Sequence, residues 1–251
     1  MAQDLRSRVF SSRFSMPDLS KRSEAIEIMD DLNCSGPVIS QTLRELEFIN
    51  KWLGGNAITL NGLNTVLSRC STSTLKIADL GCGGGDMLML ISQRLKKKNI
   101  AGDLLGIDAN PNIIAYAENH TKADSSIHYK ALNIFSEEFR RENFDLVFAT
   151  LFFHHFTREE LVGLFAHLKQ VTSCGIVVND LHRHPLAYYS IRLLTRLFSK
   201  SDMVKNDAPV SVHRGFSRNE LKEILSAAGI TNYSLSWKWA FRWQLIIYTG
   251  R

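Results

Sequence analysis

Residues 77–86 read Ile-Ala-Asp-Leu-Gly-Cys-Gly-Gly-Gly-Asp, and this stretch predicts the fold of the chain. The apolar run Leu75–Leu80 is typical of a buried strand, and the glycines after it can adopt positive φ and let the backbone approach a ligand closely. Asp86 is a suitable N-cap for a helix whose apolar stripe begins at position 87. A strand, a glycine turn and a helix N-terminus with unpaired N–H groups together predict a ligand site at the end of the strand.

Strands and helices alternate on the C-terminal side of this stretch. Apolar runs predict strands and amphipathic patterns predict helices in the order 103–108 (strand), 111–122 (helix), 127–132 (strand), 144–151 (strand), 157–172 (helix) and 174–180 (strand). This alternation is typical of a parallel sheet with right-handed crossovers. The last two runs, 233–240 and 242–249, are too close for a crossover and predict an antiparallel hairpin at the sheet edge. The predicted fold class is α/β, a Rossmann-like seven-stranded, mostly parallel sheet with an antiparallel last strand.

Two further regions are predicted to cover this sheet domain, which spans residues 71–251. Residues 1–70 form an N-terminal helical cap, in which Leu43, Leu46, Ile49 and Leu53 recur at helical spacing before Gly54 and Gly55 end the helix. An insertion at about 183–216 comprises an amphipathic helix over Pro185–Ser199 and a polar loop as far as Arg214.

The inserted helix has two distinct faces. Tyr188, Arg192 and Arg196 follow one face, and leucines at 186, 193 and 197 follow another. Three interpretations remain open: a surface helix with solvated arginines, a lid over an apolar pocket with a cationic rim, and a helix that lies on a membrane surface.

Composition excludes several classes of protein. The chain has 251 residues, of which 45% are hydrophobic and 22% charged, and such a composition excludes disorder of the bulk of the chain. No apolar run approaches the roughly 20 residues that span a bilayer, so we expect no membrane span. The four cysteines have neither disulfide nor metal-ligand spacing, and residues 1–15 lack the apolar core of a secretory signal. We therefore expect a cytoplasmic protein without a metal site.

The positive charge of the chain is concentrated in one segment. The formal net charge is +5, and residues 181–218 hold seven lysines and arginines against two aspartates. A local excess of this kind indicates a site or a partner rather than a general property of the surface.

The details of the glycine turn decide which ligand it suits. The nicotinamide fingerprint G-x-G-x-x-G fails, because the sixth position from Gly81 is Asp86, and the Lys-Ser/Thr of a phosphate-binding loop is absent. Asp79 suits a ligand with a cationic amino group, and Asp108, at the end of the next strand, can accept from both ribose hydroxyls. An adenosyl ligand with an amine and no phosphate is S-adenosylmethionine.

At these residues the chain resembles the class I S-adenosylmethionine-dependent methyltransferases, over roughly residues 40–250. Asp79-Leu80-Gly81-Cys82-Gly83-Gly84-Gly85 is similar to the first motif of that family. The resemblance implies methionine contacts at Asp79 and Gly81, a ribose contact at Asp108, adenine contacts around Ala109 and Asn133, and a sulfonium contact at Thr150-Leu151. The cofactor-binding residues expected on this basis are Asp79, Gly81, Cys82, Gly83, Gly85, Asp108, Ala109, Asn133, Ile134, Thr150 and Leu151.

Two of these assignments have structural alternatives. Asn133 stands where the family often has Asp, and it could instead be a turn residue. Thr150 could be an ordinary β-branched strand residue.

The segment 145–156 narrows the class of acceptor. It lacks the Asn/Asp-Pro-Pro-aromatic pattern of amino-directed DNA enzymes, the nucleophilic Cys of pyrimidine C5 enzymes and the glutamate pair of protein-arginine enzymes. Asn179-Asp180 imitates only one half of the metal site of catechol enzymes. The segment resembles the small-molecule branch, which includes quinone C-methyltransferases and natural-product O-methyltransferases. Segments 44–55, 179–183 and 208–214 resemble a bacterial subgroup associated with polyketide and phenolic metabolism.

The predicted reaction is methyl transfer to a small aromatic, phenolic, quinol or polyketide-type acceptor, at oxygen or carbon. Removal of an acceptor proton would need a base, for which His154 and His155 are the first candidates and His182 and Tyr188 the others. Alternatively, these imidazoles only pack or bond to the backbone.

Three further hypotheses remain, which concern turnover, the kind of acceptor and the delivery of the acceptor. The chain could bind the cofactor without turnover, or it could methylate RNA with the help of the basic segment 181–218. It could also receive a small acceptor from an acidic carrier protein docked on Arg192 and Arg196.

Overall fold

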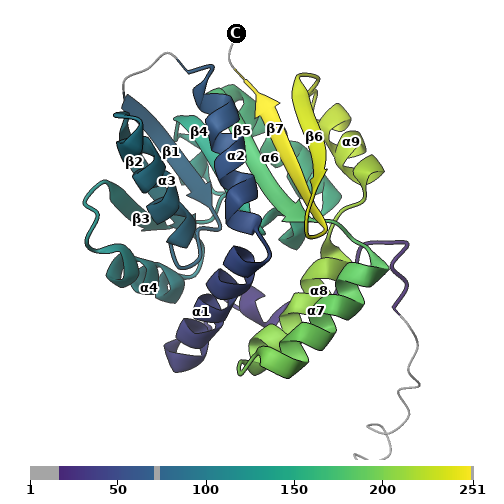
Figure 1. The fold of residues 1–251 in the computed structure, drawn as a ribbon. Helices are drawn as coiled ribbons and strands as arrows, with labels where there is room; N and C mark the ends of the chain where they lie inside the picture. The colour runs from purple at the N-terminus through teal and green to yellow at the C-terminus, as the bar shows by residue number, and fades with distance from the viewer. Residues whose placement is uncertain (1–16, 71–73, 250–251) are drawn as a thin grey trace, which may run out of the picture.

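The computed structural model describes residues 17–70 and 74–249, and residues 1–15, for which no secretory signal was expected, lie outside this description. Seven strands form one sheet in the order β3-β2-β1-β4-β5-β7-β6. The first five strands are parallel, and β7 is antiparallel to both of its neighbours, which confirms the predicted fold class (Figure 1). The strands are β1 (Thr74–Leu80), β2 (Ala101–Asp108), β3 (Ile127–Ala131), β4 (Phe144–Thr150), β5 (Thr172–Leu181), β6 (Tyr233–Lys238) and β7 (Arg242–Tyr248).

Helices cover both faces of the sheet. Successive side chains of a strand point to opposite faces, so a strand that is apolar throughout presents an apolar surface to the helices on each side. In β4, Leu146 and Phe148 belong to one apolar core, and Val147 and Ala149 belong to the other. The first core is shared with α2 (Gly55–Leu67), α3 (Asp86–Lys97) and α4 (Pro111–Thr121). The second is shared with α5 (Glu137–Arg140), α6 (Arg158–Val171) and α9 (Arg218–Ala227).

A layer of helices lies beyond the carboxyl ends of the parallel strands (Figure 1). It contains α1 (Gly36–Trp52), α7 (Pro185–Phe198), α8 (Asp202–Arg214) and the 3-10 turn η1 (Ile28–Asp30). Glu45 of α1 accepts hydrogen bonds from the Ser199 hydroxyl and from the backbone N–H of Lys200 and Ser201, so α1 holds the connection between α7 and α8. This layer forms the roof of the cavity described below.

The prediction of a polar loop before Arg214 is wrong, because most of that stretch is α8. Ser201 caps this helix by accepting from the Val204 N–H, and Asp207 and Arg214 are buried in it. Asp207 accepts from the backbone N–H groups of Ile28 and Met29. The polar side chains that suggested a loop are therefore the ones that attach the N-terminal segment to the helix.

Helix α2 packs on the sheet, although it belongs to the N-terminal region that was predicted as a cap. A Cβ at Gly62 would lie 2.4 Å from the Val177 side chain, and the Asn179 amide donates to the Gly55 carbonyl at 2.9 Å. The close approach of α2 to β5 thus requires glycine at position 62. The division of the chain at residue 70 stays a prediction.

Helix α7 covers the cavity, as the lid interpretation predicts, but with other side chains than the three leucines of its apolar face. Leu186, Leu193 and Leu197 are about 60% exposed, and the side of the helix that faces the cavity carries Ile191 and Leu194. The helix therefore covers a cavity and also presents apolar side chains to the surface. None of the helices within residues 17–70 and 74–249 combines the length and hydropathy that a bilayer span requires.

Candidate functional site

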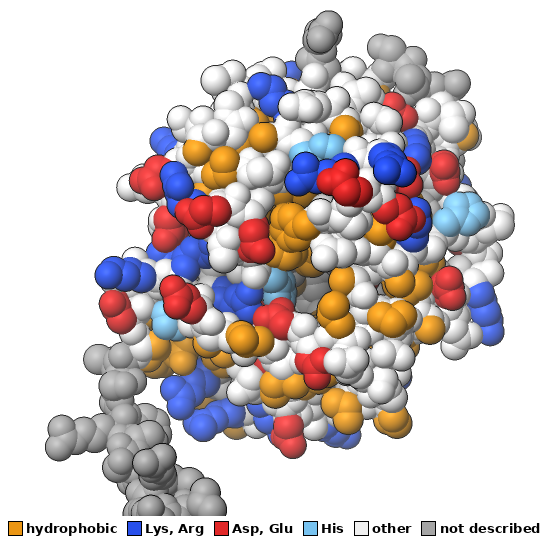
Figure 2. All heavy atoms as spheres, turned by 180° about the vertical axis from the view of Figure 1, so that it is seen from behind, with side chains coloured by type: hydrophobic (Ala, Val, Ile, Leu, Met, Phe, Trp, Pro, Cys, Tyr) orange, Lys and Arg blue, Asp and Glu red, His pale blue; other side chains and the backbone are white. Residues whose placement is uncertain are grey.

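A cavity of about 810 Å³ lies between the carboxyl ends of β1, β2 and β4 and the helical layer above them. The strand order reverses between β1 and β4, and ligands of open α/β sheets bind at this kind of switch point. Figure 2 shows the surface hollowed on this side of the molecule, with hydrophobic side chains around the hollow. Ten of the predicted cofactor residues line the cavity: Asp79, Gly81, Cys82, Gly83, Asp108, Ala109, Asn133, Ile134, Thr150 and Leu151.

The glycine turn exposes its backbone to the cavity. Gly81 has φ +67° and donates its N–H to the Ile107 carbonyl at 2.8 Å, which ties the turn to β2. Gly83 has φ +50°, and a Cβ there would meet only Leu43, at 3.7 Å. The space beside Gly83 is therefore open to a ligand that needs close contact with the main chain.

Gly85, also predicted to bind the cofactor, does not line the cavity, although Gly84 and Asp86 on either side of it do. It has φ +78° and is the N-cap of α3, so that Asp86, predicted as the cap, is the first helical residue. A Cβ on Gly85 would lie 2.0 Å from the Tyr129 hydroxyl. Gly85 is thus required for packing against β3, and a cofactor contact of this residue stays a prediction.

Asp79 is a buried carboxyl group that has no cationic partner in the described residues. It is 2% exposed, and its Oδ1 accepts no hydrogen bond there. Burial, together with the charges of Asp86 and Asp108, raises its pKa well above the usual range. A carboxylate in this position favours a ligand that brings its own positive charge.

Asp108 lies at the end of β2, as predicted, and faces the same part of the cavity. Its Oδ1 accepts from the Asn110 N–H at 3.0 Å, which fixes the carboxyl group at the cavity wall. Burial raises the pKa of this group as well, although the backbone N–H groups around it act in the opposite direction. It retains acceptor positions for a pair of hydroxyl groups.

The pKa of Asp86 predicts how the protein without ligand responds to pH. Burial, and next the charge of Glu47, raises this pKa from 3.8 to about 6. A folded-state pKa above the unfolded value stabilises the fold fully below about pH 4, and this contribution is lost as the pH rises through 6. Asp86→Asn should therefore raise the free energy of unfolding at pH 8 by about 1–3 kcal/mol, and the gain should shrink toward pH 4.

Thermal unfolding at pH 8 and pH 4 measures this effect. Asp202→Asn is the matched control, because Asp202 is also the first residue of a helix but its side chain is 97% exposed. We expect little change in its melting temperature at either pH. If Asp86→Asn raised the stability equally at pH 8 and pH 4, this result would contradict a raised pKa of Asp86 in the folded protein.

Asn133 and Thr150 take part in local structure while lining the cavity. The side-chain oxygen of Asn133 accepts from the Phe135 N–H at 2.9 Å, which is the turn role that the sequence left open. The Thr150 hydroxyl lies 3.1 Å from that of Thr59 on α2. Leu151 has φ +55°, and its N–H donates to the Asn179 carbonyl at 2.8 Å. Cofactor contacts of these residues stay predictions.

The chain turns after Leu151 into the short 3-10 helix η2 (Phe153–His155), which Asp180 holds at the end of β5. One oxygen of Asp180 accepts from the N–H groups of Phe153 and His154, at 2.8 and 3.2 Å. The other lies 2.7 Å from His154 Nδ1 and accepts from the Leu181 N–H at 2.7 Å. Burial acts to raise the pKa of Asp180, but the interactions with His154 outweigh it and hold the pKa below its usual value.

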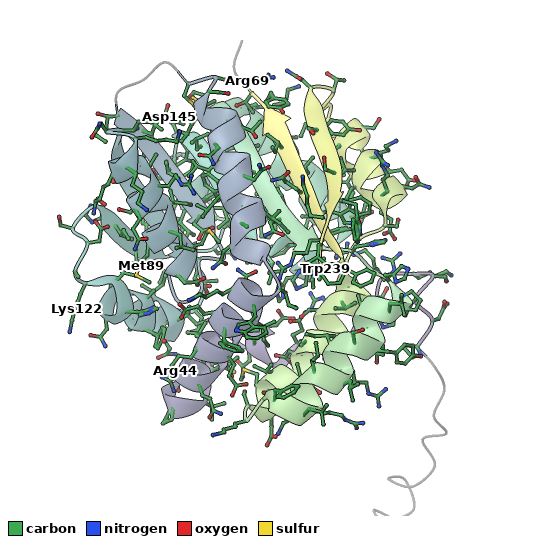
Figure 3. The ribbon with its side chains drawn as sticks, viewed as in Figure 1. Arg44, Arg69, Met89, Lys122, Asp145 and Trp239 are labelled. Carbon is green, nitrogen blue, oxygen red and sulfur yellow. The ribbon has the colours of Figure 1, made fainter. Side chains whose placement is uncertain are left out.

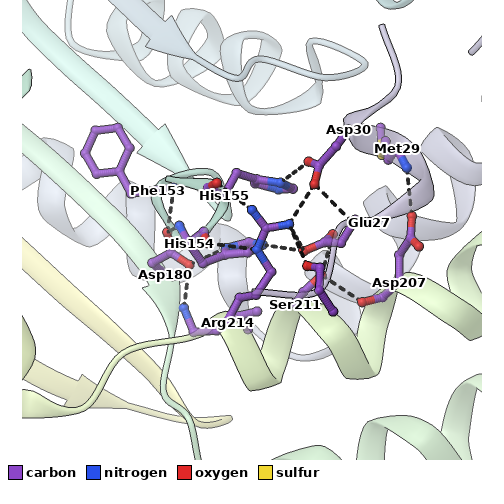
Figure 4. Close-up of polar contacts among 12 residues, drawn as sticks. Glu27, Met29, Asp30, Phe153, His154, His155, Asp180, Asp207, Ser211 and Arg214 are labelled. Carbon is purple, nitrogen blue, oxygen red and sulfur yellow. Dashed lines mark hydrogen bonds and ion pairs between the residues drawn. The ribbon is translucent and has the colours of Figure 1, made fainter. Parts of the chain in front are cut away.

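His155 and Arg214 link η2 to the N-terminal segment (Figure 4). His155 Nδ1 lies 2.6 Å from Asp30 Oδ1, and Arg214 donates to Asp30 Oδ2 at 2.6 Å and to the His154 carbonyl at 3.2 Å. Burial acts to raise the pKa of Asp30, but the hydrogen bonds from His155 and Arg214 hold it well below the usual range. The two predicted histidines are therefore brought together at the cavity wall.

Glu27 completes this polar group and was missed by the sequence analysis. It is 4% exposed, and the Ser211 hydroxyl donates to its Oε2 at 2.8 Å. Burial raises the pKa of Glu27 to about 7. Its Oε1 faces His154 Nε2 at 3.6 Å.

The other two candidate bases lie outside the cavity lining. His182 Nδ1 accepts from the indole N–H of Trp237 at 3.2 Å, and Tyr188 packs edge-on against His213. His154 and His155 are the members of the predicted set that reach the cavity.

A buried arginine of the cavity wall was also missed. Arg242 is 2% exposed, and its Nε and Nη1 donate to no group in the part of the chain that the structure describes. Burial lowers its pKa to about 10. It lines the cavity next to Trp239 and Phe241, at the tip of the β6–β7 hairpin. No sequence signal distinguished this arginine from an ordinary one at the start of a strand.

Two arginines of the basic segment 181–218 are structural. Arg183 pairs with Glu220 at 2.8 Å and donates to the Gly215 carbonyl at 2.6 Å. Arg214 is engaged by Asp30, as described above. The positive surface around this segment is correspondingly smaller than its composition suggests.

A comparison with protein families identifies the central part of the chain. A family model described as a methyltransferase domain matches residues 77–175, which include the glycine turn, Asp108 and the two histidines. No curated protein sequence is significantly similar to this chain.

Solved structures share the fold over most of the chain. The plantazolicin methyltransferase BpumL in complex with SAH is similar with a TM-score of 0.64 and 19% identity, over 85% of this chain and 89% of that one. Magnesium protoporphyrin IX methyltransferase from Synechocystis PCC 6803 with bound SAM has a TM-score of 0.52 and 12% identity, over 88% of both chains. The CMeT domain of the citrinin polyketide synthase has a TM-score of 0.57 and 14% identity, over 75% of this chain and only 50% of that one.

Proposed function

Because this chain carries a methyltransferase domain of the class I, S-adenosylmethionine-dependent kind, we propose that it methylates a small, largely apolar acceptor that bears a phenol, quinol or polyketide-type enol group. The methyltransferase domain model that matches residues 77–175 and the shared fold confirm the family that residues 79–85 resemble. The observation that carries the proposal is the cavity itself, which continues from the glycine turn into an apolar space under the helical layer.

The residues at the glycine turn fit the cofactor. The unpartnered carboxyl group of Asp79 suits its amino group, Asp108 suits the ribose hydroxyls, and the open backbone at Gly83 allows close contact. S-adenosylmethionine supplies an activated methyl group when it is bound. The enclosed wall then holds the acceptor near that group and excludes water, which accounts for most of the rate of such a transfer.

The wall of the cavity is largely apolar on the side of the helical layer. This part of the wall includes Leu46 and Ile49 of α1, Leu53 directly after that helix, and Ile191 and Leu194 of α7. These side chains favour an aromatic or polyketide-like body over a nucleotide, which supports a small molecule rather than RNA. Delivery by an acidic carrier protein stays a prediction.

The polar groups suggest how the acceptor is oriented. His154 and His155 face one end of the space, where an acceptor hydroxyl needs to lose its proton, and Asp180 fixes the His154 ring. Arg242 faces the space from the hairpin with unpartnered N–H groups. We propose that Arg242 binds a second oxygen of the acceptor, as a carbonyl or a carboxylate.

Methyl transfer to a panel of phenols, quinols and enols tests this function. The panel should contain matched pairs that differ only in a second carbonyl or carboxylate oxygen, and the measured quantity is the formation of SAH. Arg242→Met should lower kcat/KM by about 10–100-fold for acceptors with that oxygen and change little for the others. The fold should tolerate the change, because it removes a buried guanidinium group whose Nε and Nη1 make no hydrogen bond in the described residues.

Arg69→Met is the matched control, because Arg69 also packs against β7, over the Tyr248 ring at 4.0 Å, but lies at the far end of the sheet from Trp239 (Figure 3). It should leave transfer unchanged. Cofactor binding without transfer to any acceptor would instead indicate a non-catalytic binder. RNA affinity that falls steeply with salt would favour the RNA alternative.

A further inference from the structure

Three metal-ligating side chains meet at the cavity wall, from two segments that are far apart in the sequence. Glu27 precedes η1, and His154 and His155 belong to η2. One ligand atom of each lies within 4.8 Å of the others. Figure 4 shows the three side chains turned toward one another.

Two of these atoms face each other, and neither has a hydrogen-bond partner among the described residues. Asp180 Oδ1 lies 2.7 Å from His154 Nδ1, so the imidazole donates its N–H there, and in the neutral ring Nε2 carries a lone pair. Glu27 Oε1 lies 3.6 Å from this Nε2, and both atoms are buried without a hydrogen-bond partner among the described residues. Two facing lone pairs in a buried space are unfavourable unless a cation or a proton lies between them.

The separation suits a cation better than a hydrogen bond. A hydrogen bond between nitrogen and oxygen needs roughly 2.7–3.2 Å. Two ligands about 2.1 Å from a tetrahedral cation lie about 3.4 Å apart, which is close to the 3.6 Å found here.

Each histidine also has the second partner that metal ligands require. Metal-bound imidazoles usually donate their other N–H to a carboxylate, which fixes the ring and raises its basicity. His154 has this contact with Asp180, and His155 has it with Asp30 at 2.6 Å.

The nearby arginines leave the Oε1 atom of Glu27 without a hydrogen bond, although Arg214 forms a long ion pair with it. Arg214 lies 2.6 Å from Asp30 Oδ2 but 3.7 Å from Glu27 Oε1. Arg22 donates to the carbonyl oxygens of His154 and Phe156. The Oε1 atom of Glu27 therefore stays buried without a hydrogen bond, beside an imidazole nitrogen that also lacks one.

We propose that Glu27, His154 and His155 bind a divalent transition-metal ion, of which Zn²⁺ fits the ligands best. Two imidazoles and one carboxylate form the protein ligand set of catalytic zinc sites, which keep a further position for water or substrate. All three side chains line the cavity, so that position faces the acceptor space.

The ion would also bind the acceptor at this end of the cavity, and this part of the inference rests on the proposed function. A bound acceptor hydroxyl would release its proton to water, and its oxygen would stay on the cation as the methyl group moves from sulfur to that oxygen or to a conjugated carbon. The sulfur keeps the electron pair of the broken bond. The acceptor class is then one whose oxygen can bind a metal.

Titration of the metal-free full chain with Co²⁺ and Zn²⁺ tests the binding itself. We expect one equivalent of Co²⁺ with visible absorption of a four- or five-coordinate site, and displacement of that signal by Zn²⁺. Glu27→Gln and His155→Asn should each weaken the binding at least tenfold, and Zn²⁺ should raise the melting temperature of the wild type by more than that of the variants.

His128→Asn is the matched control, because His128 is an exposed histidine of β3, on the far side of β2 from the cluster. It should bind as the wild type does. The proposal is overturned if the folded wild type gives no site-like absorption, or if the Glu27 and His155 variants bind as tightly as the control. Methyl transfer by a protein that binds no metal would remove only this inference, whereas metal binding without any transfer would remove the proposed function.

Discussion

Asp108→Ala should weaken the binding of S-adenosylmethionine about 100-fold or more. Asp108 lies at the cavity wall, with its carboxyl group held by the Asn110 N–H at 3.0 Å. A ribose diol would donate two hydrogen bonds to a charged group there, each worth roughly 1.5–3 kcal/mol. Loss of about 3 kcal/mol corresponds to a hundredfold change in the dissociation constant. Calorimetric titration of the cofactor into wild type and variant measures it.

The stability of the variant separates lost binding from lost structure. Burial raises the pKa of Asp108, and this cost of the ionised group offsets the hydrogen bonds that its removal loses, so the melting temperature should change little. Asp103→Ala is the matched control on the same strand, because Asp103 is exposed at the opposite end of β2. It should bind the cofactor as the wild type does. Equal affinity of Asp108→Ala and the control would place the ligand elsewhere.

The sheet could be predicted because its strands are buried on both faces. A strand such as β4 is then apolar at nearly every position, and the helices between strands retain their own period. The hairpin of β6 and β7 followed from the short gap between two apolar runs. These patterns are local, because the residues of each segment alone indicate whether it forms a strand or a helix.

The glycine turn shows where local signals stop being sufficient. Gly83 and Gly85 look alike in the sequence, and both have positive φ. Only the position of the Tyr129 hydroxyl distinguishes them, because it fills the space beside Gly85 while the space beside Gly83 stays open. Tyr129 is on a strand more than 40 residues away, so no local pattern could assign the two roles.

The polar group at η2 could be predicted only in part, for the same reason. The histidines were recognised from their position after β4, but Glu27 and Asp30 approach them from a segment about 125 residues earlier. Arg214, which connects the two, was assigned to a loop because its helix α8 is rich in polar residues. Those residues are buried against the N-terminal segment, and only tertiary contacts reveal it.

The second large effect is expected for Asp180→Asn, which should lower the free energy of unfolding by about 2–4 kcal/mol. The two oxygens of Asp180 together accept from four donors, three of them backbone N–H groups, in a site that is 1% exposed. An amide offers one acceptor and turns an NH₂ group toward the donors on its other side. At least one buried backbone N–H then loses its partner, and a new unpaired donor is added beside it.

Urea unfolding measures this loss, and Asp145→Asn controls for the change from carboxylate to amide. Asp145 also accepts from a backbone N–H, that of Lys76 at 2.8 Å, and from the Ser173 hydroxyl at 2.6 Å. It is partly exposed at the end of the sheet away from the cavity (Figure 3), so water can replace a lost bond and the change should be below about 1 kcal/mol. A difference between the variants of less than 1 kcal/mol would contradict the role of Asp180.

The same substitution should also lower methyl transfer at least tenfold under conditions in which the variant is fully folded. Asp180 fixes both the backbone of η2 and the ring of His154, so its loss frees the imidazole to rotate and to exchange its proton between the two ring nitrogens. Cofactor affinity should change little, because Asp79 and Asp108 lie on other strands. A fall in turnover without a fall in cofactor affinity would therefore locate the role of Asp180 on the acceptor side of the cavity, where stability and activity depend on the same four hydrogen bonds.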